Sequence, residues 1–541
     1  MPFETILTPE LIEKYTSGGY WVGRTLTDDL DMAAERTPDK VAFVDPRREI
    51  TYAVLRAEVD RCALGLLELG IGSGDVVSFQ LPNWIEWVVL HLACTRIGAV
   101  SNPLIPIYRQ REVGFMVGLA GSKLVVVPRE FRGYDHVSLI ESLQADWPTF
   151  EHLLVVGGPQ SPGSWETFMA TPWEERRDPA GLAALRPDPN DVTLLIFTSG
   201  TTGEPKGVMH THNTLIAADN PLPDRLGVSS ESVVHMASTL AHLTGCLYGA
   251  RLVVQFGATG IFQDVWDPAV FVDLVEHHGI TQAAGATPFL HDTLSVEGLA
   301  DRKLDTLVRF GCFGAPIPRT LVRRAKEVLP GLAVLGGWGQ TENSLVTLGI
   351  PGDPEEKVVE TDGYPWPGMQ IRTVDAVGAA VPAGEEGRIQ VQGPFLFVGY
   401  AHRMKLTQDS FDGDWFDTGD LGIIDDDGYL RLSGRTKDII VRGGENIPVA
   451  YLEDALYEDP RIVAVAVVGM PDERLQERAA ACVVLAPGAS LTFQELQDLL
   501  REKGVAKQYW PERLGILDEL PRTPSGKIQK YRLRDRYRQE T

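Results

Sequence analysis

The sequence predicts an α/β protein with a large N-terminal part of helix-covered, largely parallel sheets, a smaller β unit, and a small α+β C-terminal domain. The chain has 541 residues, of which 44% are hydrophobic and 23% are charged. This length and composition are typical of a globular protein with a large core and at least two domains. Between residues 51 and 128, apolar residues at helical spacing alternate with short apolar runs, and such βαβ units form parallel sheets covered by helices.

Each element of this stretch has its own sequence signal. The helices show apolar residues three or four positions apart, whereas the strands are short, continuous apolar runs. Gly70 ends the first helix, and Asn83 is expected to cap the second. The expected elements are, in order, a helix over 55–66, a strand over 76–79, a helix over 83–97 and a strand over 123–127.

The rest of the chain divides into stretches of different character. Residues 157–191 are rich in proline, glycine and charge, and predict an irregular surface connection. A second α/β stretch covers 232–348, and 387–399 predicts strands of the smaller β unit. After residue 434 the pattern changes, which indicates a compact C-terminal domain that begins near Lys437. The expected elements of this domain are helices over 451–457 and 492–502 and strands over 463–468 and 480–485.

Charge and composition exclude several classes of protein. The net charge of −24 would repel a phosphate backbone, and no lysine- and arginine-rich stripe offsets it, so nucleic acid is not an expected partner. The chain has no uninterrupted apolar stretch of about 18 residues and no secretory signal at its start, so we expect a cytoplasmic protein that is not an integral membrane protein. The five cysteines form no Cys-x-x-Cys pair and are expected to be reduced and mostly buried.

The most informative segment is a glycine-rich loop that follows a predicted strand. Residues 198–207 read Thr-Ser-Gly-Thr-Thr-Gly-Glu-Pro-Lys-Gly, directly after the apolar run 192–197. Glycines let backbone N–H groups converge, hydroxyls add donors and the lysine adds charge, so the loop is suited to a polyphosphate. A flexible linker of this composition would need neither the strand nor the lysine. A P-loop needs glycine directly before its lysine, but Pro205 stands there, so the spacing rules out a P-loop NTPase.

Four further segments carry groups suited to a nucleotide. The stretch 313–316 contains small residues, which leave its backbone free to contact the edge of a flat base. The stretch 338–342 places an aromatic ring, a hydroxyl and a carboxylate just past a strand end, where open α/β sheets bind ligands. Asp420 can accept from two ribose hydroxyls beside Arg435, and Lys527 lies on a loop framed by proline and glycine. Taken singly, each segment has a plainer interpretation: a turn, a core tryptophan, a surface ion pair or a solvated basic tail.

Together these segments resemble the adenylate-forming superfamily, which contains acyl- and aryl-CoA synthetases, luciferases and the adenylation domains of peptide synthetases. Seven motifs occur in family order across nearly the whole chain, and the phrase 445–449 resembles the branch of cyclohexanecarboxylate and medium-chain acyl-CoA ligases. The motifs are 198–207, Gly314-Ala315-Pro316, Trp338-Gly339-Gln340-Thr341-Glu342, Thr418-Gly419-Asp420, Gly434-Arg435-Thr436-Lys437-Asp438, Gly443-Gly444-Glu445-Asn446 and Pro524-Ser525-Gly526-Lys527.

The resemblance implies an AMP-binding domain over 1–434 and a mobile C-terminal domain over 435–541, with a hinge near Lys437. It also implies an AMP-forming acyl-CoA synthetase. A carboxylic acid and ATP would give acyl-AMP and pyrophosphate, and coenzyme A would then displace AMP to give the acyl-CoA. Adenylation supplies the leaving group that a free carboxylate lacks. ATP, Mg²⁺ and coenzyme A are the expected cofactors, and the sequence leaves a homodimer open.

The roles that the resemblance implies follow the charge that develops on the phosphates. Lys527 would bridge the attacking carboxylate and the α-phosphate, Glu342 would hold Mg²⁺, and His242 would form a gate beside the carboxylate. With Thr198, these are the expected catalytic residues. The expected nucleotide contacts are the β- and γ-phosphates for Thr198, Ser199, Gly200, Thr201, Thr202, Gly203 and Lys206, the α-phosphate for Thr341, the adenine for Gly314, Ala315, Pro316 and Trp338, and the ribose for Asp420 and Arg435, with Gly339 and Gln340 between them.

The resemblance places the acyl pocket at 238–249, 311–314 and 336–339. The first of these segments has no Asp or Glu, so an amino-acid substrate is not expected. Its apolar residues and glycines favour a compact apolar acid, which is alicyclic, aromatic or short-to-medium aliphatic. Without the resemblance, His242 would be interpreted as a packed, hydrogen-bonded histidine.

The thiol side of the site is implied by the same resemblance. Rotation at Lys437 would bring Gly443 and Gly444 toward the pocket, where backbone without side chains can border a narrow pantetheine tunnel. Pro448 stands one place away from its position in many relatives. The entry into the next helix is therefore expected to differ.

Three other functions stay open at this point. An adenylation domain that loads a carrier-protein thiol would exchange pyrophosphate without turning over coenzyme A. A luciferase-like oxygenase would consume O₂ from the adenylate, and nothing local requires one. A non-enzymatic nucleotide or acyl sensor would bind ATP without releasing pyrophosphate, and the presence of Lys527 and Glu342 argues against it.

Overall fold

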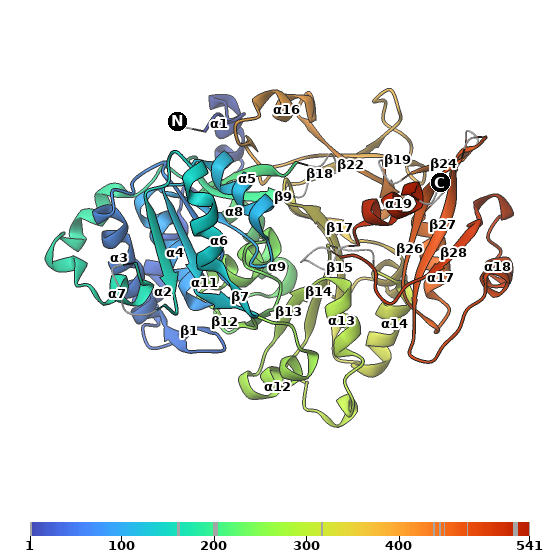
Figure 1. Cartoon of the computed structure of the whole chain (residues 1–541), viewed down its shortest axis with the longest axis horizontal. Coiled ribbons are helices and arrows are strands. Elements are labelled where there is room, and N and C mark those ends of the chain that lie inside the picture. The colour runs from blue at the N-terminus through green and yellow to red at the C-terminus, as the bar shows by residue number, and fades with distance from the viewer. Residues whose placement is uncertain are drawn as a thin grey trace.

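The computed structural model describes residues 3–158, 163–198, 204–314, 317–436, 439–442, 445–447, 449–472, 474–522 and 528–539. Within these residues the strands form sheets of nine, seven, five, five and two strands. Helices cover the two large sheets, which confirms the α/β class. The C-terminal elements, orange to red in Figure 1, lie at one end of the molecule beside α13 (Thr287–Thr293) and α14 (Arg319–Val328).

The seven-stranded sheet carries the phosphate loop. Its central strands pair in parallel, because each βαβ crossover returns the chain in the same direction. The antiparallel strands β10 and β20 complete one edge. The predicted strands over 76–79 and 123–127 are confirmed as β3 and β5. The order is β20 (Gly399–Tyr400), β10 (Lys206–Thr211), β9 (Val192–Thr198), β4 (Val100–Pro103), β3 (Val76–Phe79), β5 (Leu124–Pro128) and β8 (His152–Val156).

The helices over 55–66 and 83–97 are present as α3 and α4. Helix α4 is apolar on all sides and nearly all of its residues are buried, as expected for a helix inside a domain core. The N-cap of α4 is Trp84, so the prediction that Asn83 caps it is wrong. The helices of the N-terminal part are α1 (Pro9–Ser17), α2 (Leu26–Arg36), α3 (Tyr52–Glu68), α4 (Ile85–Ile97), α5 (Gln110–Ala120), α6 (His136–Leu143), α7 (Trp165–Ala170), α8 (His212–Asp219), α9 (Leu222–Leu226), α10 (Leu243–Gly245), α11 (Leu252–Phe256), α12 (Pro268–His278), α13, α14, α15 (Glu355–Glu360) and α16 (Met404–Asp409).

The nine-stranded sheet changes partner within one strand. Strand β15 pairs in parallel with β14 and then, from Gly337, antiparallel with β16. The strand therefore continues through Trp338 to Gln340, and the prediction that Trp338 lies past the strand end is wrong. Glycine allows this close pairing, since a Cβ on Gly339 would lie 1.8 Å from the carbonyl oxygen of Ser344. The order is β17 (Tyr364–Pro365), β16 (Ser344–Leu348), β15 (Ala333–Gln340), β14 (Arg309–Cys312), β13 (Gln282–Gly285), β11 (Val233–Met236), β12 (Thr259–Phe262), β1 (Val41–Val44) and β2 (Glu49–Thr51).

The smaller β unit is a five-stranded antiparallel sheet. The prediction over 387–399 is half right, because β19 belongs to this sheet whereas Gly399 lies in β20 of the seven-stranded sheet. The prediction that 157–191 is irregular is also partly wrong. This segment contains α7 and two 3₁₀ turns, held by the buried side chains of Trp165 and Trp173. The strands of the β unit are β18 (Gln370–Val374), β19 (Glu386–Gln392), β21 (Phe411–Asp412), β22 (Trp415–Ile424) and β23 (Leu430–Arg435).

The C-terminal elements have a sheet and an apolar core of their own. The predicted helices and strands of this region are all present, with Thr492 forming a capping box at the start of α18. The elements are β24 (Ile440–Arg442), β25 (Glu445–Ile447), α17 (Val449–Tyr457), β26 (Ile462–Asp472), β27 (Gln476–Leu485), α18 (Phe493–Glu502), β28 (Arg513–Ile516) and α19 (Lys530–Gln539).

Two predictions from composition can be compared with this fold. In the parts of the chain that the structure describes, no helix combines the length and the apolar character needed to span a bilayer. All five cysteines are buried and unpaired, as expected.

Candidate active site

A cavity of about 850 Å³ lies between the N-terminal sheets and the C-terminal elements. Its N-terminal wall includes strand ends and loops that the sequence singled out, together with α13 and α14. Its C-terminal wall includes α17, the start of β26 and the start of α19. The structure therefore brings together residues predicted for the adenine and the ribose, which are Gly314, Trp338, Gly339, Asp420 and Arg435.

Asp420 holds this wall together. Its carboxylate is buried, at 4% exposure, and accepts hydrogen bonds from the Trp338 indole (2.8 Å) and the Gln340 amide (2.9 Å). The Arg435 guanidinium pairs with its other oxygen at 2.8 Å. These partners come from β15 and β23, while Asp420 lies on β22, so one carboxylate joins two sheets at the edge of the cavity. Charge-assisted bonds of this kind fix the orientation of the indole ring.

The turn that presents Asp420 is held by its own backbone contacts. Gly419 has φ +69°, a conformation that favours glycine. The Thr418 hydroxyl donates to the carbonyl of Ile389 (2.8 Å) and accepts from the Asp420 N–H (3.1 Å). The carboxylate position is thus set by the neighbouring strand β19.

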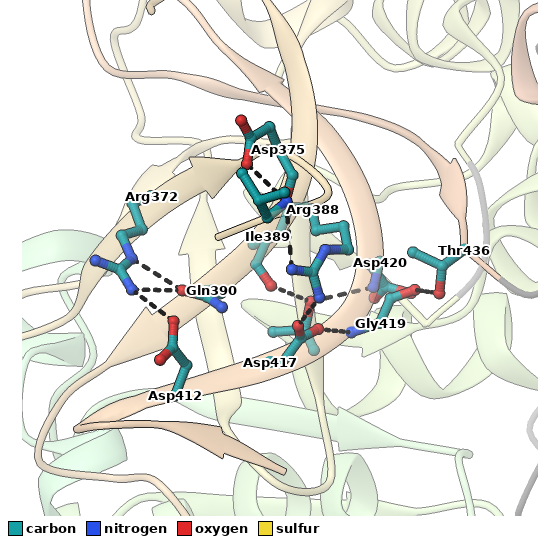
Figure 2. A network of polar contacts seen from close by, with 12 residues as sticks. Arg372, Asp375, Arg388, Ile389, Gln390, Asp412, Asp417, Gly419, Asp420 and Thr436 are labelled. Carbon is teal, nitrogen blue, oxygen red and sulfur yellow. Dashed lines mark hydrogen bonds and ion pairs between the residues drawn. The ribbon is translucent and has the colours of Figure 1, made fainter. Parts of the chain in front are cut away.

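Figure 2 shows the polar contacts that surround this turn and join it to Thr436, at the start of the predicted hinge. Asp417 pairs with Arg388 and accepts from the Gly419 N–H at 3.0 Å. The hydroxyl and the backbone N–H of Thr436 both donate to the Gly419 carbonyl, each at 3.0 Å. Thr436 directly precedes Lys437, so the chain is fixed at the ribose turn immediately before the predicted hinge.

A second cluster lies at the base of the phosphate loop. Lys206 faces Thr198 across the β9–β10 pair, so the two ends of the loop are held together. The Lys206 ammonium lies 4.8 Å from the centre of the Tyr400 ring, and the Tyr400 hydroxyl donates to Glu342 at 2.9 Å. Burial raises the pKa of Tyr400 well above its usual range, and the Glu342 carboxylate raises it further, so the hydroxyl keeps its proton. Tyr400 therefore links the loop lysine to the predicted metal ligand.

His210 holds the backbone of Thr341 in position. The Thr341 carbonyl can only accept, so His210 Nε2 carries the proton and donates to it at 2.7 Å. Burial lowers the pKa of His210 to about 4, so the ring is neutral. Sequence analysis missed both His210 and Tyr400. Their positions next to the phosphate loop in β10 and β20 become apparent only when those strands pair.

Asn83 has a different role from the predicted cap. Its buried amide donates to the carbonyls of Ser238 (3.0 Å) and Gln263 (3.1 Å) and accepts the Leu240 N–H (2.8 Å). Both amide hydrogens are thus used, and the oxygen accepts from Leu240 and not from the first turn of α4. Asn83 thus fixes the path of the segment that leads to His242.

His242 is the N-cap of α10. Its Nδ1 accepts the Thr244 N–H at 3.3 Å, so the neutral ring carries its proton on Nε2. Among the described residues, those that line the interdomain cavity do not include His242, Thr198 or Glu342. The structure therefore separates the predicted site into a nucleoside cavity, a phosphate cluster and an acyl segment.

Several predicted residues lie outside the described parts of the chain. The base of the Lys527 loop is nevertheless described. Arg522 and Ile528 form an antiparallel bridge, and Lys530 pairs with the buried Glu453 at 2.7 Å. Arg522, Ile528 and Lys530 all line the cavity, so the described residues on either side of segment 523–527 belong to the cavity wall. The predicted residues outside the described parts are Ser199, Gly200, Thr201, Thr202, Gly203, Ala315, Pro316, Lys437, Gly443, Gly444 and Lys527.

A large α/β unit and a smaller C-terminal unit border this cavity. Comparison with known families identifies the class of protein. Residues 30–401 match the family described as AMP-binding enzyme, and residues 451–527 match the AMP-binding enzyme C-terminal domain. The chain belongs to the AMP-binding enzyme family.

Individual relatives are similar over nearly their whole length. A medium-chain fatty-acid–CoA ligase of Escherichia coli (strain K12) is 37% identical over 524 residues, 96% of this chain and 92% of that protein. A salicyl-AMP ligase/salicyl-S-ArCP synthetase of Mycobacterium tuberculosis is 34% identical over 533 residues, 95% of this chain and 91% of the relative. The crystal structure of the anthranilate CoA ligase AuaEII with anthranoyl-AMP superposes with a TM-score of 0.86 at 25% identity, covering 95% of this chain and 98% of that one.

Because His210 is buried in its neutral form, the free energy of unfolding is expected to depend on pH. The unfolded histidine takes up its proton near pH 6.5, whereas the folded one does so only near pH 4. Stability contributed by His210 is therefore complete above pH 6.5 and is lost as the pH falls toward 4, by up to about 3 kcal/mol. His210→Gln keeps a donor for Thr341 but removes the titration, so urea unfolding of the variant should depend less on pH across this range. An identical pH dependence in both proteins would contradict the assignment.

Proposed function

We propose that this protein is an ATP-dependent, AMP-forming carboxylic acid–CoA ligase that works through an acyl-AMP intermediate. The observation that carries the proposal is the cavity walled by Trp338, Asp420 and Arg435, whose wall also contains the described residues on either side of segment 523–527. Similarity to a medium-chain fatty-acid–CoA ligase and to an anthranilate CoA ligase supports coenzyme A as the thiol and a compact acid as the substrate. The domain boundary is proposed near Lys437.

In the first step, a carboxylate oxygen of the acid attacks the α-phosphorus of ATP. A carboxylate O–P bond forms, the bond to the β-phosphate oxygen breaks, and pyrophosphate leaves. Negative charge gathers on the phosphoryl oxygens, so preorganised cations stabilise the transition state. Lys527 neutralises the attacking carboxylate and the α-phosphate, and Lys206 neutralises the departing pyrophosphate. Trp338 stacks on the adenine, and Asp420 with Arg435 holds the ribose.

In the second step, the thiol of coenzyme A attacks the acyl carbon of acyl-AMP. A C–S bond forms, the C–O bond to phosphate breaks, AMP leaves as an anion, and the thiol proton goes to solvent. Rotation at Lys437 moves Lys527 away and brings Gly443 and Gly444 to the pocket.

His242 acts earlier, when the acid binds. With its proton on Nε2, it donates a hydrogen bond to a carboxylate oxygen of the acid.

Mg²⁺ fits the phosphate cluster. Among the described residues, no group of three or more His, Cys, Asp or Glu side chains is arranged around a metal position. Mg²⁺ in phosphoryl-transfer sites usually uses only one or two carboxylates together with substrate phosphates. Glu342, which Tyr400 orients beside Lys206, would hold the ion. When bound, Mg²⁺ would offset negative charge on the phosphates.

A panel of carboxylic acids tests this function. The protein is mixed with ATP, Mg²⁺ and coenzyme A, and release of AMP and formation of thioester are measured for each acid. We expect AMP and acyl-CoA in equal amounts with at least one alicyclic, aromatic or short-to-medium aliphatic acid. Pyrophosphate exchange with the acid but no acyl-CoA would favour the carrier-protein alternative, which the similarity to a salicyl-S-ArCP synthetase keeps open. ATP binding without pyrophosphate release would favour a sensor.

Lys527→Ala is expected to separate the two half-reactions. Because the ammonium is proposed to act only while the anhydride forms, acyl-AMP formation should fall by at least about 100-fold. Thioester formation from supplied acyl-AMP should stay within a few-fold of the unmodified protein. Lys503→Ala, which removes an exposed lysine in the same part of the chain, serves as the control. Equal loss of both half-reactions would refute the role.

Asn83→Ala is expected to act on the acid and not on ATP. Loss of the two bonds to the acyl segment and of the bond to Gln263 should raise the KM for the acid by about tenfold, since small misplacements of binding groups are costly. The KM for ATP should stay nearly constant. Asn213→Ala is the matched control, because Asn213 is also a buried amide but bonds to Asn190 and to the Gly23 N–H. A parallel rise of both KM values in Asn83→Ala would show a general structural effect instead.

A further inference from the structure

A buried polar cluster lies behind the acyl segment. It consists of Tyr248 and Arg251, both on the π-helical turn η4 (Cys246–Arg251), and Asp219 at the end of α8. Asp219 and Arg251 have no exposed surface, and Tyr248 is 8% exposed. π-Helical turns are rare and occur frequently at functional sites.

Most of the polar atoms in this cluster lack partners. Both Asp219 carboxylate oxygens and two of the Arg251 nitrogens form no hydrogen bond with any described residue, and the Tyr248 hydroxyl has only the backbone of Leu345 beside it. The remaining terminal nitrogen of Arg251 bonds to His91 at 3.0 Å. Buried polar atoms are almost always satisfied, so such a concentration of unsatisfied groups indicates a missing partner.

The cluster adjoins all three segments assigned to the acyl pocket. Tyr248 belongs to the first, and its ring lies 5.7 Å from that of Phe313 in the second. Leu345 pairs with Gly339 of the third, and its backbone interacts with the Tyr248 hydroxyl group. Burial raises the pKa of Tyr248 well above its usual range, and the nearby Asp219 carboxylate raises it further. Tyr248 thus lies between the pocket segments and the buried carboxylate.

The acidic and basic groups of the cluster indicate what kind of group it accepts. Burial raises the pKa of the Asp219 carboxyl group well above its usual range and lowers the pKa of Arg251, and each group acts on the pKa of the other against that effect. His91 and His212, which face Arg251, are neutral because burial lowers the pKa of each. Beyond them, Asp29 is paired with Arg24 at 2.9 Å. The cluster thus holds one acidic and one basic group, and burial disfavours a charge on either, so it favours a neutral partner over an ammonium or a second carboxylate.

We propose that Tyr248, Asp219 and Arg251 form the far end of the acyl pocket, and that the preferred acid carries a neutral hydrogen-bonding group, a hydroxyl or keto group, at the end remote from its carboxyl group. The proposal rests on the acid–CoA ligase function above and adds the substrate class. A hydroxyl both donates and accepts, which matches a cluster of one phenol, one carboxylate and one guanidinium. Sites built to bond a hydroxyl discriminate strongly against acids that lack it, because their own polar groups are then left unpaired.

The test uses matched pairs of acids that differ only in one hydroxyl. Suitable pairs are cyclohexanecarboxylate with its 4-hydroxy derivative, benzoate with its 3- and 4-hydroxy derivatives, and octanoate with 8-hydroxyoctanoate. For each pair, kcat/KM for AMP release is measured in the unmodified protein and in Tyr248→Phe, which removes one oxygen atom. We expect a preference of at least about tenfold for the hydroxy acid in one pair or more. The variant should lose most of that preference, measured as the ratio of the two kcat/KM values.

Tyr52→Phe is the matched control. Tyr52 is also buried, but its hydroxyl lies within hydrogen-bond distance of the carbonyls of Val253 (2.8 Å) and Ala258 (2.7 Å). Its loss should lower Tm and leave the ratio of hydroxy to apolar acid unchanged. Tyr248→Phe removes a hydroxyl with fewer partners and should lower Tm of the ligand-free protein less than Tyr52→Phe does.

The outcomes separate this inference from the function on which it rests. If apolar acids are turned over and preferred in every pair, or if Tyr248→Phe leaves the preference unchanged, the substrate class is wrong while the ligase function stands. The cluster would then be satisfied by buried water alone. If no acid releases AMP, the ligase function fails and this inference fails with it. A reduced preference in Asp219→Asn, with Tyr52→Phe unchanged, would support the cluster independently of Tyr248.

Discussion

The buried carboxylate of Asp420 is the contact on which the nucleoside end of the site depends. It accepts from Trp338 and Gln340 on one sheet and pairs with Arg435 on another strand of its own sheet. A buried charge is costly unless it is paired and hydrogen-bonded, so these partners are required and their geometry is fixed. The same contacts orient the indole, close the ribose turn and fix the chain just before the predicted hinge. One ionised group thus determines three features of the cavity wall.

The phosphate end follows the same logic with different chemistry. Tyr400 and His210 are both held in their uncharged forms by burial, and each donates one hydrogen bond to the strand end that carries Thr341 and Glu342. Neutral donors hold that strand end without adding charge to it. The charge near the phosphates is then left to Lys206 and, in the proposed mechanism, to Lys527. The groups that position the strand end are therefore neutral, and the positive charge that offsets the phosphates in the first step comes from the lysines alone.

Local sequence signals predicted most of the fold. Strands such as β3 and β5 are short apolar runs, so they were predictable. Of the predicted site, the structure places Gly314, Trp338, Gly339, Asp420 and Arg435 around one cavity. Asn83 shows where this approach fails. A polar residue before an apolar helix looks like a cap, but its side chain bonds to Ser238, which is far away in the sequence. Trp338 was misplaced because glycines that usually end a strand here allow β15 to pair closely with β16. Asp219 gave no signal at all, since its environment is created by a helix that follows it in the chain.

The two buried polar clusters of this protein differ in one respect, and that difference supports separate roles for them. One oxygen of Asp420 accepts two hydrogen bonds and the other pairs with Arg435 at 2.8 Å, so this carboxylate is compensated within the free protein and can belong to a rigid wall. The oxygens of Asp219 have no such partners among the described residues. A protein of marginal stability has little reason to keep uncompensated groups in its interior unless another molecule compensates them. Polar groups that are compensated within the protein keep a fixed geometry, which suits a cavity wall. Polar groups without partners suit a specific binding site, because a site distinguishes between ligands through the groups that a wrong ligand leaves unpaired.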